Sequence, residues 1–203
     1  MRAQDIMSAP VVTVTPETSA KHAAELLAAN GFTALPVVDD DDRLIGMVTE
    51  ADLIGDRFPQ DPRYRNGTQP VAGNRVGDVM TTPATGMGPG CDLVELTRAL
   101  LDSRIRAMPV VDGSRVVGIV TRGDIVRTFA RDDAEIAADV RHHLSVYGGP
   151  DRWQVEVHDG VASIVDAFDS ETDRHVATVL AEAVPGVVTA RCVASNEEGT
   201  SDE

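Results

Sequence analysis

The apolar residues between positions 20 and 27 recur at i, i+3, i+4 and i+7, which is the spacing of one helix face. Ser19 stands where an N-cap belongs, and Gly31 is a good helix stop. Residues 36–38 and 44–48 have the pattern of short buried strands separated by a polar turn. A second helix is expected directly after the second of these strands. Together with a strand end ahead of the first helix, the pattern predicts a β-α-β-β-α unit.

The same unit occurs a second time along the chain. Three segments of the first copy recur after 73, 73 and 72 residues: 5–10 as 78–83, 35–39 as 108–112, and 46–52 as 118–124. The one-residue slip falls in a polar turn, where a change of length is tolerated. An internal repeat of this kind predicts two copies of one supersecondary unit packed together.

The chain is acidic, with 33 Asp and Glu against 18 Lys and Arg and a formal net charge of −15. An acidic surface repels DNA, RNA and anionic lipid, so we expect no nucleic-acid partner and no membrane association. Aromatic residues make up only 3%, which disfavours base-stacking surfaces. Only residues 71–131 carry a net positive charge, with 8 basic and 6 acidic residues. This segment is therefore the expected location of an anionic ligand.

The cysteines and histidines indicate neither a disulfide framework nor a catalytic or metal site. Cys91 and Cys192 are far apart in the sequence, which disfavours a disulfide framework. No apolar run approaches the length of a membrane span, and the N-terminus lacks the apolar core of a signal peptide. We therefore expect a cytoplasmic protein without enzymatic activity. Cys91 stands at a predicted helix start, where the helix dipole lowers a thiol pKa; a redox-sensing role and an inert thiol both remain open.

A Thr-x-x-Asp motif precedes the second helix of each copy: Thr49 with Asp52, and Thr121 with Asp124. One interpretation is a capping box, in which the hydroxyl and the carboxylate satisfy free N–H groups at the helix start. The other is a ligand site, since free N–H groups can bind phosphate and a carboxylate can accept hydrogen bonds from a ribose diol. Both interpretations can hold in turn.

Residues 1–130 resemble a pair of CBS motifs, the family named for cystathionine β-synthase. Both copies carry D-[IV]-M near the start, then [LM]-P-V-V-D, then G-[MI]-V-T-x-x-D. The resemblance implies an α+β fold in which the two motifs pack about a pseudo-two-fold axis. It also implies an adenosyl ligand such as AMP, ADP, ATP or S-adenosylmethionine in the cleft, and pairing of two modules into a homodimer.

The resemblance further assigns roles to residues around the cleft. The aspartates of the two motifs would hold ribose, and the threonines would lie near ribose or phosphate. Basic residues before [LM]-P-V-V-D often bind phosphate in the family, which makes Arg106 the stronger candidate and Thr33 a weak one. We rank Asp124, Thr121 and Arg106 as the main site, because they belong to the positive segment. The glycines at 86–90 either leave room for adenine or form a loose loop without a role in binding.

The last third has the pattern of a separate α/β domain. A helix is predicted from Asp133, alternating strands at 153–157 and 161–165 flank Asp159-Gly160, and a second helix ends before Pro185-Gly186. The D-G-V and V-P-G-V segments resemble a BON domain, although Asp166 stands where that family usually has glycine.

We therefore expect a first CBS motif (1–58), a linker (59–74), a second CBS motif (75–131), a BON-like domain (132–195) and an acidic disordered tail (196–203). The expected function is a regulatory sensor that binds an adenosyl ligand. Binding would change the conformation of the CBS pair, and an unknown downstream protein would respond to that change. The alternative is a ligand-free structural or protein-interaction module.

Overall fold

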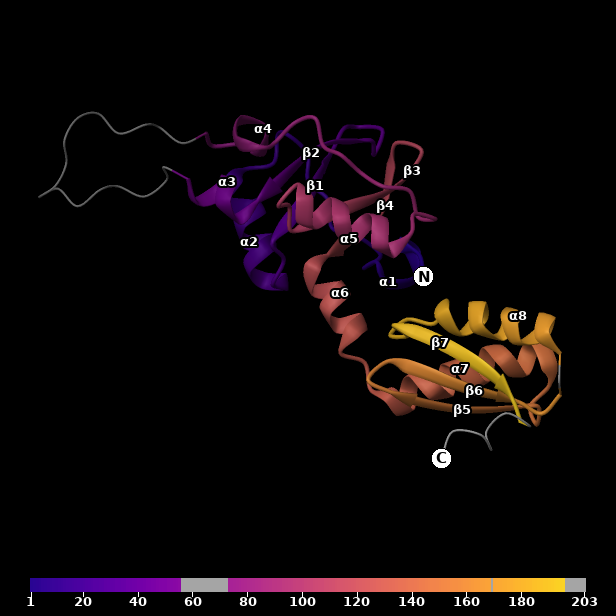
Figure 1. The fold of residues 1–203 in the computed structure, drawn as a ribbon. Coiled ribbons are helices and arrows are strands. Elements are labelled where there is room, and N and C mark those ends of the chain that lie inside the picture. The colour runs from indigo at the N-terminus through magenta and orange to yellow at the C-terminus, as the bar shows by residue number, and fades with distance from the viewer. Residues whose placement is uncertain (56–72, 169, 196–203) are drawn as a thin grey trace, which may run out of the picture. The chain divides into compact units, whose positions relative to one another are not determined.

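The computed structural model describes residues 1–55, 73–168 and 170–195. Two compact units make up the chain, one formed by Met7–Arg122 and the other by Met1–Ile6 with Gly123–Glu203. We call them the repeat unit and the C-terminal unit (Figure 1). The predicted linker at 59–74 lies mostly outside the described residues, and the predicted tail at 196–203 lies entirely outside them.

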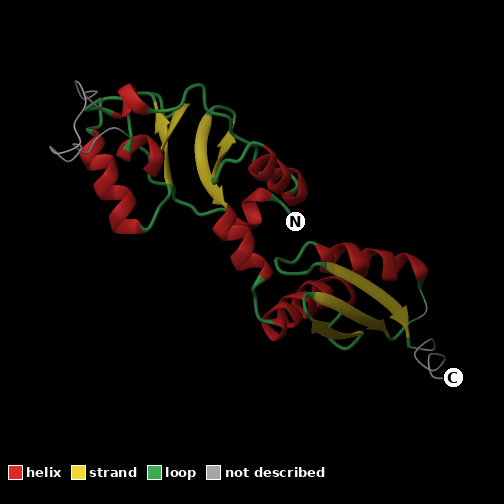
Figure 2. Ribbon diagram, turned by 60° about the vertical axis from the view of Figure 1, so that its left-hand side comes forward, coloured by secondary structure: helices red, strands yellow, loops and turns green. Residues whose placement is uncertain are grey.

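The repeat unit contains two antiparallel hairpins with helices beside them (Figure 2). Its strands are β1 (Ala34–Val38), β2 (Leu44–Thr49), β3 (Ala107–Asp112) and β4 (Arg115–Thr121), and its helices are α2 (Ala20–Asn30), α3 (Glu50–Ile54), α4 (Val76–Val79) and α5 (Leu93–Asp102). β1 pairs with β2, and β3 pairs with β4. This mixed α+β arrangement of two similar halves agrees with the sequence prediction.

The predicted helix signals of α2 are confirmed. The Ser19 side chain accepts a hydrogen bond from the His22 N–H, and Gly31 adopts the left-handed conformation with φ 65°. Ala20, Ala23 and Leu27 are buried, which fixes the core-facing side of the helix. The exception is Ala24, which is exposed although its spacing assigned it to the same face. In the second copy, Asp92 caps α5 by accepting from the Val94 N–H.

Each hairpin gains one further residue from the chain ahead of its helix. Val14 pairs in parallel with Val37 of β1, and Met87 pairs in the same way with Val110 of β3. The backbone of Met87 is hydrogen-bonded to β3 at 3.0 and 2.8 Å, so within 86–90 this residue extends the sheet and is not open to adenine. Nothing lies within 4 Å of a Cβ placed at Gly88 or Gly90.

The two repeats exchange their N-terminal segments. Ser8 of the first copy bridges to Ile119 of β4, and Thr81 of the second copy bridges to Met47 of β2. The same exchange brings the Met7 side chain against Gly118. Since each half supplies a segment to the other, the pair is expected to fold as one unit.

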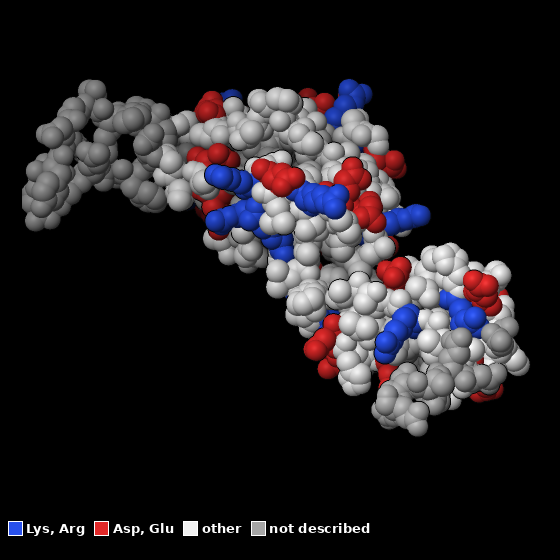
Figure 3. Space-filling model, viewed as in Figure 1, with Lys and Arg blue, Asp and Glu red and all other residues white. Residues whose placement is uncertain are grey.

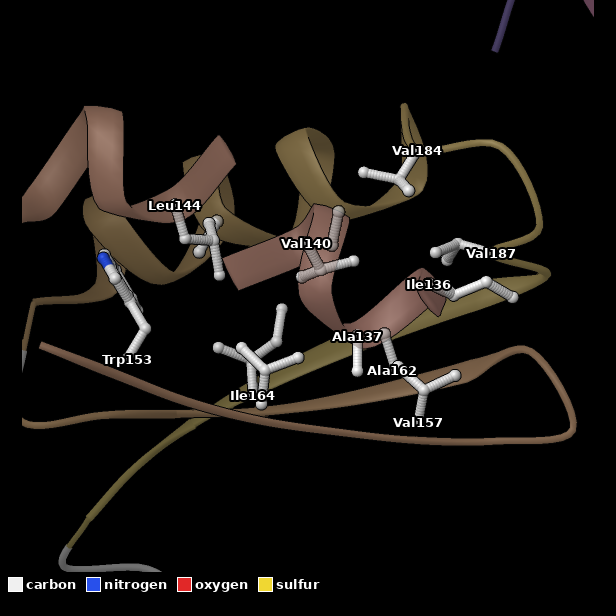
Figure 4. Close-up of a cluster of buried hydrophobic side chains, with 13 residues drawn as sticks. Ile136, Ala137, Val140, Leu144, Trp153, Val157, Ala162, Ile164, Val184 and Val187 are labelled. Carbon is white, nitrogen blue, oxygen red and sulfur yellow. The ribbon is translucent and has the colours of Figure 1, made fainter. Parts of the chain in front are cut away.

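The C-terminal unit has its own hydrophobic core. Its main elements are α7 (Asp133–Gly148), β5 (Trp153–His158), β6 (Val161–Asp166), α8 (Glu171–Glu182) and β7 (Thr189–Ala194). The central strand β6 pairs antiparallel with β5 and parallel with β7. Ile136, Val140 and Leu144 of α7 belong to one buried cluster with Ile164 of the sheet (Figure 4). Their spacing of four residues buries one side of the helix.

The C-terminal unit includes α1 (Ala3–Ile6) and nearly all of α6 (Arg122–Phe129), so the two compact units divide the chain at Gly123. The physical reason lies at the end of α6. The Arg131 guanidinium donates to the Pro185 carbonyl oxygen at 2.5 Å and to the Asp139 carboxylate at 2.7 Å. Gly186, with φ 100°, lies close to the Thr128 carbonyl oxygen. These contacts attach the helix to the turn before β7.

Candidate functional site

The repeat unit contains a cavity of about 630 Å³ whose walls come from both repeats. The first repeat contributes the start of β1 and the junction between β2 and α3, including Thr33 and Thr49. The second repeat contributes residues 81–85, the end of α5 and the start of β3, including Arg106. Three of the six candidate ligand residues therefore line one cavity, although they are distant in sequence.

The Thr49 and Asp52 motif forms the predicted capping box at the start of α3. The Asp52 Oδ2 atom accepts from the Thr49 backbone N–H at 2.8 Å and from the Thr49 hydroxyl at 2.7 Å. Among the described residues, no hydrogen bond is made to Asp52 Oδ1. Asp52 itself does not line the cavity, but Thr49 and the two residues that follow it do. One carboxylate oxygen thus remains for a further donor close to the cavity wall.

Two arginines supply positive charge to the cavity. Arg104 and Arg106 both line it, and both are exposed. Glu50 is the acidic residue on the opposite repeat that lines the same space. In the view of Figure 3, Lys and Arg side chains gather over α5, interspersed with acidic ones. An anionic group is therefore better accommodated at the arginine wall than a cationic group.

Arg122 fixes the backbone between the two arginines. Its Nε atom donates to the Ile105 carbonyl oxygen at 3.0 Å, and its Nη2 atom donates to the Leu100 carbonyl oxygen at 2.7 Å. The Arg122 backbone N–H also donates to the Arg106 carbonyl oxygen at 3.1 Å. The guanidinium satisfies helix-end carbonyl groups, so Arg122 positions the cavity wall instead of offering its charge to a ligand.

The structure places the second Thr-x-x-Asp motif elsewhere. Thr121 ends β4, and Asp124 lies on α6. Neither is among the described residues that line the large cavity. Asp124 lines a smaller hollow of about 350 Å³ in the C-terminal unit, where it forms an ion pair with Arg127. The expected grouping of Arg106 with Thr121 and Asp124 is therefore replaced by a grouping of Arg106 with Thr33 and Thr49.

Arg106 shares a cavity with Thr49 because the repeats exchange segments. The exchange brings the start of β3 in the second copy to the end of β2 in the first. Neither residues 81–85 nor Arg104 were among the candidate ligand residues predicted from the sequence. Their only signal was the repeat itself, because residues 81–83 fall in the recurring segment of the second copy. Position in a repeat does not reveal which residues of the other copy lie opposite.

Cys91 does not have the properties of a reactive thiol. Its partial burial raises the pKa of the thiol, and the neighbouring Glu95 carboxylate raises it further. The sequence had suggested a lowered pKa from the helix start. Burial and the acidic neighbour both act against a lowered pKa, which favours the inert interpretation.

Comparison with known proteins gives the family of the repeat unit. The family model described as CBS domain matches residues 3–56 and 76–131. The chain belongs to the CBS-domain family. The matched residues of this CBS pair end at Arg131, so they do not extend to the BON-like segment.

Curated relatives of the CBS pair include plant and bacterial proteins. It is 34% identical over 134 residues to the chloroplastic CBS domain-containing protein CBSX1 of Arabidopsis thaliana, covering 56% of this chain and 57% of that protein. It is 30% identical over 145 residues to the CBS domain-containing protein YhcV of Bacillus subtilis, covering 71% and 97%. The chain thus spans just over half of the plant relative and nearly all of the bacterial one.

Solved structures share the fold of the CBS pair. One is CBSX2 in complex with AMP, with a TM-score of 0.53, 31% identity, and coverage of 62% of this chain and 94% of that one. Another is the CBS domain pair of MJ0100 in complex with 5′-methylthioadenosine and S-adenosyl-L-methionine, with a TM-score of 0.54, 27% identity, and coverage of 64% and 96%. In this chain, no helix within the described residues is both long and apolar enough to span a membrane.

Proposed function

We propose that this protein is a non-catalytic regulatory module that binds an adenosyl ligand in the cavity of its CBS pair. The observation that carries the proposal is the shared cavity of about 630 Å³, where Thr33, Thr49 and Arg106 meet. Structural neighbours of similar fold were solved with AMP or with S-adenosylmethionine, which supports an adenosyl compound as the ligand class.

Each wall of the cavity suits a different part of such a ligand. Asp52 Oδ1 would accept from the ribose diol while Oδ2 stays in the capping box with Thr49. Arg106, with Arg104 beside it, would bind a phosphate or carboxylate group. The Thr33 hydroxyl would contribute a smaller polar contact. Binding contacts from both repeats would favour one relative placement of the two halves, which is how the ligand state could be relayed.

The test is a binding measurement on the full chain. Calorimetry with AMP, ADP, ATP and S-adenosylmethionine at up to millimolar concentration should detect at least one complex, and Asp52→Asn should weaken it. Asp151→Asn is a matched control, because Asp151 is an exposed carboxylate outside the cavity. Absence of binding by all four compounds would contradict the sensor proposal and favour a structural or interaction module.

We also propose that the CBS pair forms a homodimer through its helices. α3 and α5 expose large apolar side chains that a single module does not bury: Ile54, Val94 and Leu101. Exposed apolar side chains that gather on one face are typical of an interface. Light scattering should give the mass of a dimer, and Leu101→Glu should shift it toward a monomer. A monomeric wild-type protein at tens of micromolar would contradict this part of the proposal.

The C-terminal unit would act as a BON-like relay to a downstream protein in the cytoplasm. Its hairpin turns at Asp159-Gly160, where both residues have positive φ. Residues 132–203 contain 16 acidic and 4 basic residues, which opposes binding to anionic lipid. Retention of the protein on anionic vesicles at ordinary salt would contradict this assignment.

A further inference from the structure

The residue three positions after the aspartate of each Thr-x-x-Asp motif differs in charge between the two repeats. With the offset of 72 residues that relates Asp52 to Asp124, the counterpart of Arg127 is Gly55. The first repeat therefore has no side chain at the position where the second repeat has a guanidinium group. This residue lies next to the aspartate on the helix surface, so it can change the chemistry of the motif.

In the structure, Arg127 is paired with the carboxylate of its own motif. Its Nη2 atom contacts Asp124 Oδ1, and Asp124 is only 5% exposed. The Arg127 side chain is 71% exposed, so it covers the carboxylate from the solvent side. Asp52 has a different environment, since all the hydrogen bonds recorded for its carboxylate come from Thr49.

We propose that Arg127 closes the second motif to ligand, so that each chain binds a single adenosyl ligand, at the first motif. This inference rests on the proposed function. A ribose diol binds a carboxylate by donating two hydrogen bonds, and at Asp124 the Arg127 guanidinium already occupies an oxygen. The ligand would have to displace a charged partner from a buried acid, which is costly when the acid is then left without a counter-ion.

The hollow around Asp124 provides no replacement for that charge. Apart from Arg127, the basic residue that lines this hollow among the described residues is Arg131. Its guanidinium already donates to the Asp139 carboxylate and to the Pro185 carbonyl oxygen. Asp5 adds a second carboxylate to the same hollow. A phosphate-bearing ligand would therefore meet two acids and two arginines that are each already paired with protein groups, unlike the arginines of the large cavity.

Equilibrium dialysis of the full chain with AMP tests the inference through the number of ligands bound per chain. The wild-type protein should bind one AMP; Asp52→Asn should weaken that event about 10- to 150-fold, as expected for loss of a charge-assisted hydrogen bond, whereas Asp124→Asn should leave it unchanged. Arg127→Ala should bind a second AMP, and adding Asp124→Asn to Arg127→Ala should remove it. Arg98→Ala is the control, because Arg98 is an exposed helix arginine outside both hollows.

The inference fails if the wild-type protein binds two AMP molecules per chain, or if Arg127→Ala stays at one. If the wild-type protein binds two AMP molecules per chain and Arg127→Ala binds one, Arg127 contacts the ligand and does not exclude it. Arg127→Gln, which keeps a polar side chain but removes the charge, guards against misfolding of the alanine variant and should give the same gain. A wild-type protein that binds no adenosyl compound would overturn the proposed function itself, and this inference with it.

Discussion

Arg152 donates to both carboxylate oxygens of Asp166, at 2.7 and 2.8 Å, and Asp166 is completely buried. The same guanidinium reaches the Asp173 carboxylate at 2.8 Å and lies 4.3 Å from the centre of the Trp153 ring. The residue that departs from the BON pattern is thus the centre of an ion-pair cluster at the end of β6.

Removal of the buried carboxylate should destabilise the C-terminal unit. Asp166→Ala leaves the Arg152 guanidinium, which is 13% exposed, with only Asp173, and breaking a buried pair costs about 3–5 kcal/mol. Urea unfolding followed by Trp153 fluorescence measures this directly, since Trp153 is the single tryptophan of the chain. The exposed Asp151→Ala serves as control and should change the midpoint little.

The same cluster predicts loss of stability in acid. The Arg152 guanidinium lowers the pKa of Asp166 and also lowers the pKa of Asp173, with the Tyr147 hydroxyl contributing to the second shift. A carboxyl whose folded-state pKa lies below its unfolded value stabilises the fold above that unfolded value, ~3.9, and the contribution is lost as the pH falls through the folded-state pKa. The urea midpoint of Trp153 fluorescence should therefore decrease from pH 6 to pH 3.

Asp166→Asn should show a smaller decrease over the same range, because the neutral amide does not titrate. Equal pH dependence of the variant and the wild-type protein would show that other carboxyl groups cause the acid sensitivity.

Because of the exchange between repeats, a larger residue at position 118 should destabilise the fold. A Cβ atom at this position would overlap the Met7 side chain, so Gly118→Ala should cost roughly 1–3 kcal/mol through overpacking. Gly88→Ala is the matched control, since nothing lies within 4 Å of a Cβ placed there and its φ is not positive. The double variant Gly118→Ala with Met7→Ala should cost less than the sum of the two single changes. Strict additivity in thermal unfolding would contradict the contact.

Arg106 should distinguish charged from neutral ligands. Arg106→Gln removes a charged donor from the cavity wall, so the affinity for AMP should fall about 10- to 150-fold while that for adenosine stays the same. Arg98→Gln should affect neither compound. If the arginine variant weakens AMP and adenosine equally, Arg106 supports the cavity wall but does not bind phosphate.

Local features of this chain were determined by the sequence itself. The helix caps at Ser19, Gly31 and Asp92, the buried stripe of α7 and the turn at Asp159-Gly160 all follow from interactions among residues a few positions apart. The repeat, visible as recurring segments, also predicted two similar halves. Hydrogen bonds and side-chain periodicity act over these short distances, so a single sequence contains enough information to predict them.

Only the tertiary structure decided which residues meet. Exchange of the N-terminal segments between the repeats brings Arg106 to the cavity of Thr49, while Asp124 lies with Arg127 in the C-terminal unit. The ion pair of Asp166 with Arg152 could not be predicted from the sequence either, because the two residues come together only when β5 pairs with β6. The spacing within the Thr-x-x-Asp motif is the same in both copies. Their surroundings differ because packing between segments about seventy residues apart places different side chains beside each motif.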